Sequence, residues 1–248
     1  MDSIVERFIE VVITCAESEE PFDIYLNFQA LTLDVIARIA MAIKADSLGR
    51  PQRRLLHWRG LSLFQGKVAL TREHVLANCL AYLLAGYETT STTLAHVAFM
   101  LAKHPDGIVD FNATAQLKYL DAVIISFARK ALRDTEACGI RIPKGVWVTC
   151  NVDAVHRNPE LWPDPDTFDP DSTGPQHPLS WVAFGLGPRH CVGLRFAKLQ
   201  MKRTLIAFLR RFTLTLPEEL KDKPLRYRET SFLCRPMEVM VRLTKRDM

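Results

Sequence analysis

Apolar residues recur every three or four positions along three stretches of the chain, and this spacing predicts three helical regions. The first lies within residues 1–45, the second is Thr71–Lys103, and the third is Leu194–Arg211. Thr71 is a suitable N-cap residue for the second region. His104 is followed by a proline, which cannot continue a helix. We therefore expect helices to dominate, with the longest one in the middle region.

Strand-forming segments are short and lie in the second half of the chain. Residues 138–152 are typical of two strands on either side of a turn at Pro143–Gly145, and residues 237–243 of a final strand. Residues 156–178 are dense in proline, which favours an ordered loop. The predicted fold class is mainly α with a minor β part.

A glycine lies in the middle of the longest predicted helix. Gly86 is followed closely by Thr89 and Thr90. A glycine inside a helix costs about 1 kcal/mol relative to alanine. Something other than helix propensity therefore accounts for Gly86.

Composition excludes several classes of protein. The chain has 248 residues, of which 48% are hydrophobic and 24% charged, as in ordinary globular proteins. The net charge of +4 is not concentrated in stripes, so we expect no nucleic-acid binding. The longest apolar run, Cys79–Tyr87, is about half of the ~20 residues that a membrane-spanning helix needs. Charged residues interrupt the N-terminal region, so we expect neither a signal peptide nor a membrane anchor there.

The six cysteines form no CxxC pair and no zinc-finger spacing with histidine. One of them, Cys191, follows a glycine-rich turn in the sequence FGLGPRHCVG (residues 184–193) and precedes the third predicted helix. A helix N-terminus favours the thiolate, which is the form that binds metals. Gly185 and Gly187 allow positive φ, and Gly193 leaves room for a flat group. The alternative from spacing alone is an ordinary buried cysteine beside a helix cap.

Five residues of this segment match the pattern F-x-x-G-x-R-x-C-x-G and so resemble the haem-binding loop of the cytochrome P-450 family. These residues are Phe184, Gly187, Arg189, Cys191 and Gly193.

Other segments resemble the same family, in its order. Residues 85–90 (AGYETT) resemble its oxygen-activating helix, and residues 116–124 the start of its K helix. Residues 138–145 and 156–170 resemble its β-hairpin and meander. The resemblance runs through most of residues 25–245 and is closest to animal microsomal enzymes that oxidise steroids and drugs.

The resemblance implies a haem-dependent monooxygenase that inserts one atom of O2 into an apolar organic substrate. The cofactor would be haem b (iron protoporphyrin IX), with Cys191 as the metal ligand through its axial thiolate. Arg189 would pair with a haem propionate, Phe184 would cover the sulfur side, and Gly187 and Gly193 would complete the loop. The implied partners are an NADPH-dependent reductase and an apolar small molecule, and the implied location is the endoplasmic reticulum membrane.

The resemblance also assigns roles in the middle helix. Ala85 and Gly86 would open the helix so that oxygen and substrate fit beside the haem. Thr89 would hydrogen-bond the bound oxygen, and Glu88 would help to deliver protons. Without the resemblance, the expectation is that Thr89 bonds back to its own helix and that Glu88 faces water.

The chain departs from the family at the charged E-x-x-R motif of the K helix. No glutamate lies between Asp121 and Glu136. In one alignment Ser126 replaces the glutamate and Arg129 is the motif arginine. In the preferred one, Arg129 is a later arginine that contacts a haem propionate, and the motif is deleted. Ser172 stands where the family usually has the arginine partner of the motif.

Further segments of the family are absent, including the helices that cover the substrate, which the family places between the segments AIKADSLGRPQ (residues 42–52) and LTREHVLANCLAYLLAG (residues 70–86). We therefore predict a single partial cytochrome P-450 domain over residues 1–248. Residues 1–110 would hold the distal helices, and residues 111–248 the hairpin, meander, haem-binding loop, C-terminal helix and strands. The alternative is a non-catalytic truncated member, a splice product or faulty gene model with weak or no haem binding.

Three basic residues follow Cys191 on the third predicted helix, namely Lys198, Lys202 and Arg203. They would face an acidic electron-donor protein, or simply form a solvated helix face.

Overall fold

A computed structural model describes residues 1–48, 71–104, 126–165, 167, 177, 179–228 and 233–246. The elements in chain order are α1 (Asp2–Glu17), β1 (Phe22–Asp23), α2 (Ile24–Met41), α3 (Arg72–Lys103), β2 (Ser126–Lys130), β3 (Thr135–Ala137), β4 (Ile140–Ile142), β5 (Trp147–Asn151), α4 (Val152–His156), the 3-10 helix η4 (Gly187–Arg189), α5 (Leu194–Leu209), β6 (Phe212–Thr215), η5 (Glu218–Leu220), β7 (Tyr227–Arg228), β8 (Arg235–Pro236) and β9 (Met240–Lys245). The mainly α fold class with a minor β part is confirmed.

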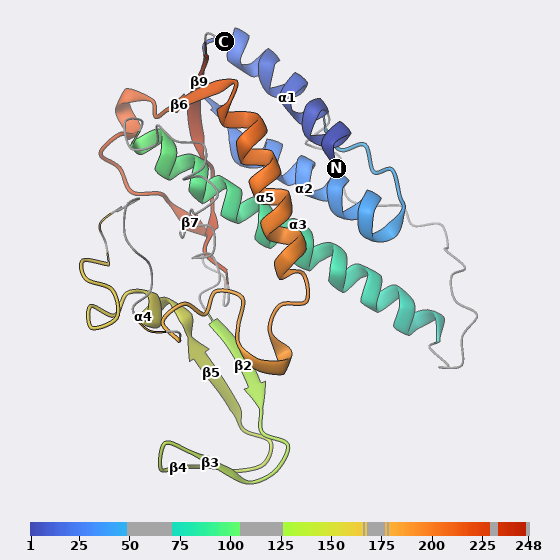
Figure 1. The fold of residues 1–248 in the computed structure, drawn as a ribbon, viewed down its shortest axis with the longest axis vertical. Coiled ribbons are helices and arrows are strands. Elements are labelled where there is room, and N and C mark those ends of the chain that lie inside the picture. Colours follow the sequence, from blue (N-terminus) through green and yellow to red (C-terminus); the bar gives the residue numbers. More distant parts are fainter. Residues whose placement is uncertain are drawn as a thin grey trace.

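Four helices form the body of the protein, with α5 crossing α3 and with α1 and α2 beside them (Figure 1). Their core holds an aromatic cluster in which α1, α2 and α5 each contribute one fully buried ring, Phe8, Phe28 and Phe208. The ring centroids lie 5.5 to 6.2 Å apart. Aromatic pairs at this separation are stabilising beyond their buried area. The cluster therefore fixes α5, the helix that follows Cys191, against the N-terminal helices.

A three-stranded antiparallel sheet in the order β1-β9-β6 joins the two ends of the chain. Val241 of β9 pairs with Phe22, and Leu243 pairs with Leu214 of β6. Asp23 caps α2 by accepting from Tyr25 N and also accepts from Val239 N, at 3.0 and 2.9 Å. One carboxylate thus ties α2 to the C-terminal strand.

Strands β2 to β5 form a narrow ribbon that extends away from the helices (Figure 1), whereas β7 and β8 pair with each other, and β8 contacts α3. β2 pairs with β5, and β3 pairs with β4 at the outer end. The sequence predicted strands on both sides of Pro143–Gly145, and both are present as β4 and β5. However, they do not pair with each other, because each pairs with an earlier strand that the sequence pattern did not reveal.

The three predicted helical regions are confirmed. The first region is divided into α1 and α2. Thr71 caps α3 by accepting from His74 N at 3.4 Å, and α3 ends at Lys103. The predicted third helix is α5, which ends at Leu209, before Arg211. The predicted K-helix start at 116–124 and the position of Ser172 lie outside the described residues.

The expectation of no membrane anchor in the N-terminal region is not confirmed. Helix α2 contains an 18-residue window with a mean hydropathy of 1.2, which is long and apolar enough to span a membrane. Buried residues make up 61% of this window. Core helices of soluble proteins pass the same test, so the finding is weak support for a membrane span.

Candidate functional site

The Cys191 loop is held by short backbone hydrogen bonds. Gly185 N donates to Val182 O and Cys191 N donates to Phe184 O, both at 2.8 Å. Gly185 and Gly187 have φ of 70° and 74°, which side-chain-bearing residues rarely adopt. The predicted use of these glycines for positive φ is confirmed, and they fold the loop back so that Cys191 lies just ahead of α5.

The side chain of Cys191 is exposed. This excludes the alternative of an ordinary buried cysteine beside a helix cap. A Cβ built on Gly193 would lie 3.9 Å from the sulfur, at ordinary contact distance. An exposed sulfur on a fixed loop is accessible to a ligand or a metal.

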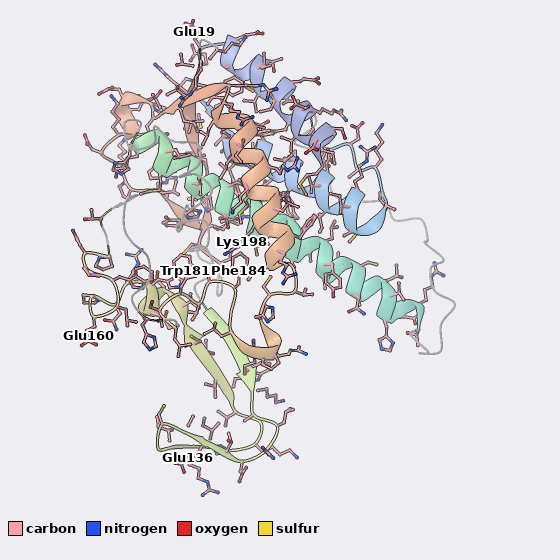
Figure 2. All side chains as sticks on the ribbon, viewed as in Figure 1. Glu19, Glu136, Glu160, Trp181, Phe184 and Lys198 are labelled. Atoms are coloured by element: carbon pink, nitrogen blue, oxygen red, sulfur yellow. The ribbon has the colours of Figure 1, made fainter. Side chains whose placement is uncertain are left out.

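Phe184 begins the loop and is anchored to the protein. It packs against the main core cluster, and the Lys198 ammonium lies 5.3 Å from its ring centroid. Figure 2 shows both residues near the end of α5 that carries the loop. This distance is typical of a cation–π contact. The loop is therefore attached to α5 through both a side-chain contact and the backbone.

The two arginines that the sequence assigned to haem binding are in contact beside the loop, although they lie 60 positions apart in the chain. Arg129 on β2 donates from Nη2 to the backbone oxygen of Arg189 at 3.1 Å. It also donates from Nη1 to Ala128 O at 2.9 Å. Because Arg129 lies on a strand, the alignment that makes it part of a helical E-x-x-R motif is wrong. The hydrogen bond places the Arg129 guanidinium beside the backbone of the Cys191 loop.

The middle of α3 lies close to the start of α5. Phe196, in the first turn of α5, packs against an apolar cluster that also involves Leu83 and Tyr87 of α3. These two residues lie on either side of Ala85 and Gly86. The fold therefore brings the predicted oxygen-activating segment toward the helix that follows Cys191.

Helix α3 is not opened at Ala85 and Gly86, and that expectation is wrong. The helix is continuous from Arg72 to Lys103. A Cβ built on Gly86 would lie 2.8 Å from Cδ1 of Ile36 on α2. Gly86 therefore leaves the space into which the Ile36 side chain of α2 packs. Ala85, the neighbouring residue, is exposed.

Thr89 and Glu88 are both engaged within the protein. Thr89 Oγ1 donates to Ala85 O at 2.6 Å, which is the back-bonding expected without the family resemblance. Glu88 does not simply face water, because its carboxylate accepts from Arg235 Nη1 of β8 at 2.8 Å and both side chains are largely buried. Burial raises the pKa of Tyr87, so this neighbouring phenol stays protonated.

Two of the three basic residues on α5 also have partners within the protein. Lys198 lies over Phe184, and Arg203 pairs with Asp2 of α1 at 2.7 Å. The charge on this face of α5 is therefore partly neutralised.

Comparison with known proteins places these features in a family. The family profile described as "Cytochrome P450" matches residues 61–108 and 116–243. The chain belongs to this family. Its described part has a partial cytochrome P450 fold.

Several curated animal cytochromes P450 are similar to the chain. Cytochrome P450 3A29 of Sus scrofa is 34% identical over 176 residues, which cover 58% of the chain and 35% of that protein. Probable cytochrome P450 6a14 of Drosophila melanogaster is 32% identical over 71% of the chain and 40% of that protein. Thromboxane-A synthase of Sus scrofa is 32% identical over 71% of the chain and 39% of that protein. The matched region thus spans well under half the length of these relatives.

Cytochrome P450 membership implies haem, and the residues of the loop fit that group. The sulfur of Cys191 is exposed and lies just ahead of the N-terminus of α5, so a haem iron could reach it. Arg129 and Arg189 supply the donors that suit carboxylates such as haem propionates.

The motif in residues 184–193 identified the loop, but it did not reveal the residues that hold it. The Glu88 carboxylate is held by Arg235. The segment before the loop is held by His156, which bonds to Val182 N and stacks on Trp181. No local signal marks them, because each acts through a contact between distant segments.

Proposed function

We propose that this chain provides the haem-binding part of a haem-thiolate monooxygenase, in which Cys191 would hold the haem iron through its thiolate. The haem would supply the activation of O2, one atom of which enters an apolar substrate while the other leaves as water. Two electrons would come from NADPH through a reductase, and two protons would be delivered from water. The observation that carries the proposal is the exposed thiol of Cys191 on a loop closed by the Cys191 N–Phe184 O hydrogen bond.

The loop would orient the sulfur before haem binds. Its hydrogen bonds and its positive-φ glycines fix the backbone on both sides of Cys191. A ligand held in this way loses little conformational freedom on binding. Phe184 would cover the sulfur side, and Gly187 and Gly193 would let a planar ring approach the backbone.

The two arginines would hold the propionates. A guanidinium forms paired hydrogen bonds to a carboxylate, and Arg129 is already oriented toward the loop by its bond to Arg189 O. The preferred alignment, in which Arg129 contacts a propionate, is consistent with this position on β2.

The middle of α3 would form the opposite wall. Exposed Ala85 would face the haem, with Gly86 allowing α2 to support the helix from behind. Thr89 Oγ1 donates its proton to Ala85 O, so its lone pairs are available to accept a hydrogen bond from a bound group or a water. Glu88 would deliver protons either after its ion pair with Arg235 has broken or while the pair is still formed.

Membership of the family supports a proposal for the partners and the location. We propose an NADPH-dependent reductase as electron donor, an apolar small molecule as substrate, and the endoplasmic reticulum membrane as the location. Lys202 on α5 would contribute to the reductase contact, since Arg203 is already paired with Asp2.

A spectrum of the reduced chain with carbon monoxide tests the proposal. Haem-loaded wild-type chain should give the thiolate-type Soret band, and Cys191→Ala should abolish it. Cys138→Ala is the matched control, because Cys138 is the other exposed thiol among the described cysteines and lies in the turn between β3 and β4. Failure of the wild-type chain to take up haem, or loss of the band in both variants, would contradict the proposal.

A further inference from the structure

A histidine contacts the segment that leads into the Cys191 loop. His156, the last residue of α4, accepts at Nε2 from the backbone N of Val182 at 3.2 Å. Its ring stacks on Trp181, with centroids 4.7 Å apart and planes 14° apart. Trp162 packs edge-on against the same indole at 5.8 Å. These contacts cross 26 positions of the chain and join α4 to the start of the loop.

The hydrogen bond defines the protonation state of His156. A backbone N–H can only donate, so Nε2 must carry a lone pair and the imidazole must be neutral, with its proton on Nδ1. Burial lowers the pKa of His156, while the charge of Asp153 on the same helix opposes this effect. Asp153 is itself paired with Arg157 at 3.0 Å. Trp181 and Val182, which pack against the imidazole from the other segment, bring no charge.

Val182 is linked to Cys191 by successive hydrogen bonds. The N–H of Val182 donates to His156, and its carbonyl accepts from Gly185 N at 2.8 Å. Two residues further on, Phe184 O accepts from Cys191 N. Val182 and Ala183 are buried, with 5% and 2% of their surface exposed. A shift at Val182 would therefore be transmitted to the backbone that carries the sulfur.

We propose that His156 is a positioning residue whose neutral imidazole fixes the segment 182–191 and thereby the direction of the Cys191 sulfur. The part of this inference that concerns iron rests on the proposed function. The part that concerns the hydrogen bond is a property of the chain alone. The two parts are therefore measured separately.

Two substitutions distinguish the effect of the hydrogen-bond acceptor of His156 from the effect of its aromatic ring. His156→Gln keeps an oxygen within reach of Val182 N, whereas His156→Phe keeps an aromatic ring on Trp181 but has no acceptor. His74→Phe, in the exposed first turn of α3, is the control for adding a phenyl ring. Hydrogen–deuterium exchange of residues 182–191 is measured on the whole chain without haem.

At about pH 7.5, where histidine is mostly neutral, wild type and His156→Gln should protect this segment equally. His156→Phe should exchange about five- to tenfold faster, the factor that loss of one hydrogen bond corresponds to. Well below the lowered pKa of His156, wild type should lose protection relative to His156→Gln, because glutamine does not titrate. Equal exchange of wild type and His156→Gln at every pH would overturn the proposal even if His156→Phe does not fold.

The iron part is tested with haem-loaded protein and carbon monoxide. The fraction with the thiolate-type band should fall in His156→Phe and return to the wild-type value in His156→Gln. An unchanged fraction in His156→Phe would overturn the positioning role. Absence of the band in wild type, together with the expected exchange pattern, would refute the proposed haem function and support the role of His156 in fixing the segment.

Discussion

The missing side chain of Gly86 provides the space that Ile36 occupies. A Cβ at Gly86 would lie 2.8 Å from Cδ1 and 3.0 Å from Cγ1 of Ile36, which is 6% exposed. The packing of Ile36 of α2 against the middle of α3 therefore uses the space that the glycine leaves.

Gly86→Ala should destabilise the protein by about 1 kcal/mol. Overpacking of a core costs about 1–3 kcal/mol, and the gain in helix propensity offsets about 1 kcal/mol of this. In an Ile36→Val background, which removes Cδ1, Gly86→Ala should instead become neutral or stabilising. Urea unfolding of the four proteins measures the coupling. Additive effects of the two substitutions would show that the two residues do not compete for space.

The ion pair between Glu88 and Arg235 should stabilise the attachment of β8 to α3. Both side chains are largely buried, at 26% and 31% exposure, yet still in contact with solvent. We expect Glu88→Gln and Arg235→Gln each to cost about 1 kcal/mol, with non-additive effects. The coupling should shrink at high salt. A double-mutant cycle by urea unfolding at low and high salt measures it, and the exposed pair Lys245–Glu17 serves as comparison.

Arg129→Lys should weaken haem binding about tenfold or more. Lysine lacks the guanidinium fork, so it cannot bond to Ala128 O and Arg189 O while also pairing with a propionate. Charge-assisted hydrogen bonds contribute about 1.5–3 kcal/mol each. Titration of the chain with haem measures the affinity. Arg133→Lys, at an exposed position beyond β2, is the control, and an equal loss in both variants would refute a specific role for Arg129.

Stability should decrease as the pH falls through the range in which His96 becomes charged. The imidazole stacks on Tyr227 at 5.5 Å and donates from Nδ1 to Thr92 O at 2.8 Å. Burial lowers the pKa of His96 more than the hydrogen bond to Thr92 raises it. The unfolded chain, with a histidine pKa of about 6.5, therefore binds more protons than the folded chain. The stabilisation is complete above about pH 6.5 and is lost as the pH falls through the lowered pKa of the folded state.

Urea midpoints from about pH 8 to about pH 5 measure this slope. His96→Gln should flatten it, whereas His74→Gln, at an exposed position, should leave it unchanged. The pKa of His156 is also lowered by burial, so His156 contributes to the pH dependence of stability in the same direction. The double variant His96→Gln/His156→Gln should therefore show a flatter pH dependence than His96→Gln alone. A slope that His96→Gln does not change would contradict the assignment.

Most helices were predictable because their apolar residues repeat with the helical period. The cap at Thr71 and the end of α3 followed from local chemistry. The strands were predicted less well. β4 and β5 were found, but their partners β3 and β2 were not, since strand pairing joins segments that local patterns do not connect.

In the candidate site, too, local features were predictable from the sequence, whereas contacts between distant segments were not. Residues 184–193 were identified by a local motif, and the structure confirms the turn that its glycines form. The approach of Arg129 to Arg189 was not predicted, nor was the pairing of Glu88 with Arg235 across 147 positions. The reason for Gly86 was assigned incorrectly, because the side chain that needs the space belongs to a different helix.

The amino-acid order alone thus determined the helices, the cysteine loop and the family, since each depends on residues close together in the chain. Tertiary structure decided which groups meet: the imidazole of His156 with the amide of Val182, and α2 with the middle of α3. The physical reason is that periodicity, capping and turn geometry act over a few residues, whereas packing and hydrogen bonding between segments depend on how the whole chain is folded.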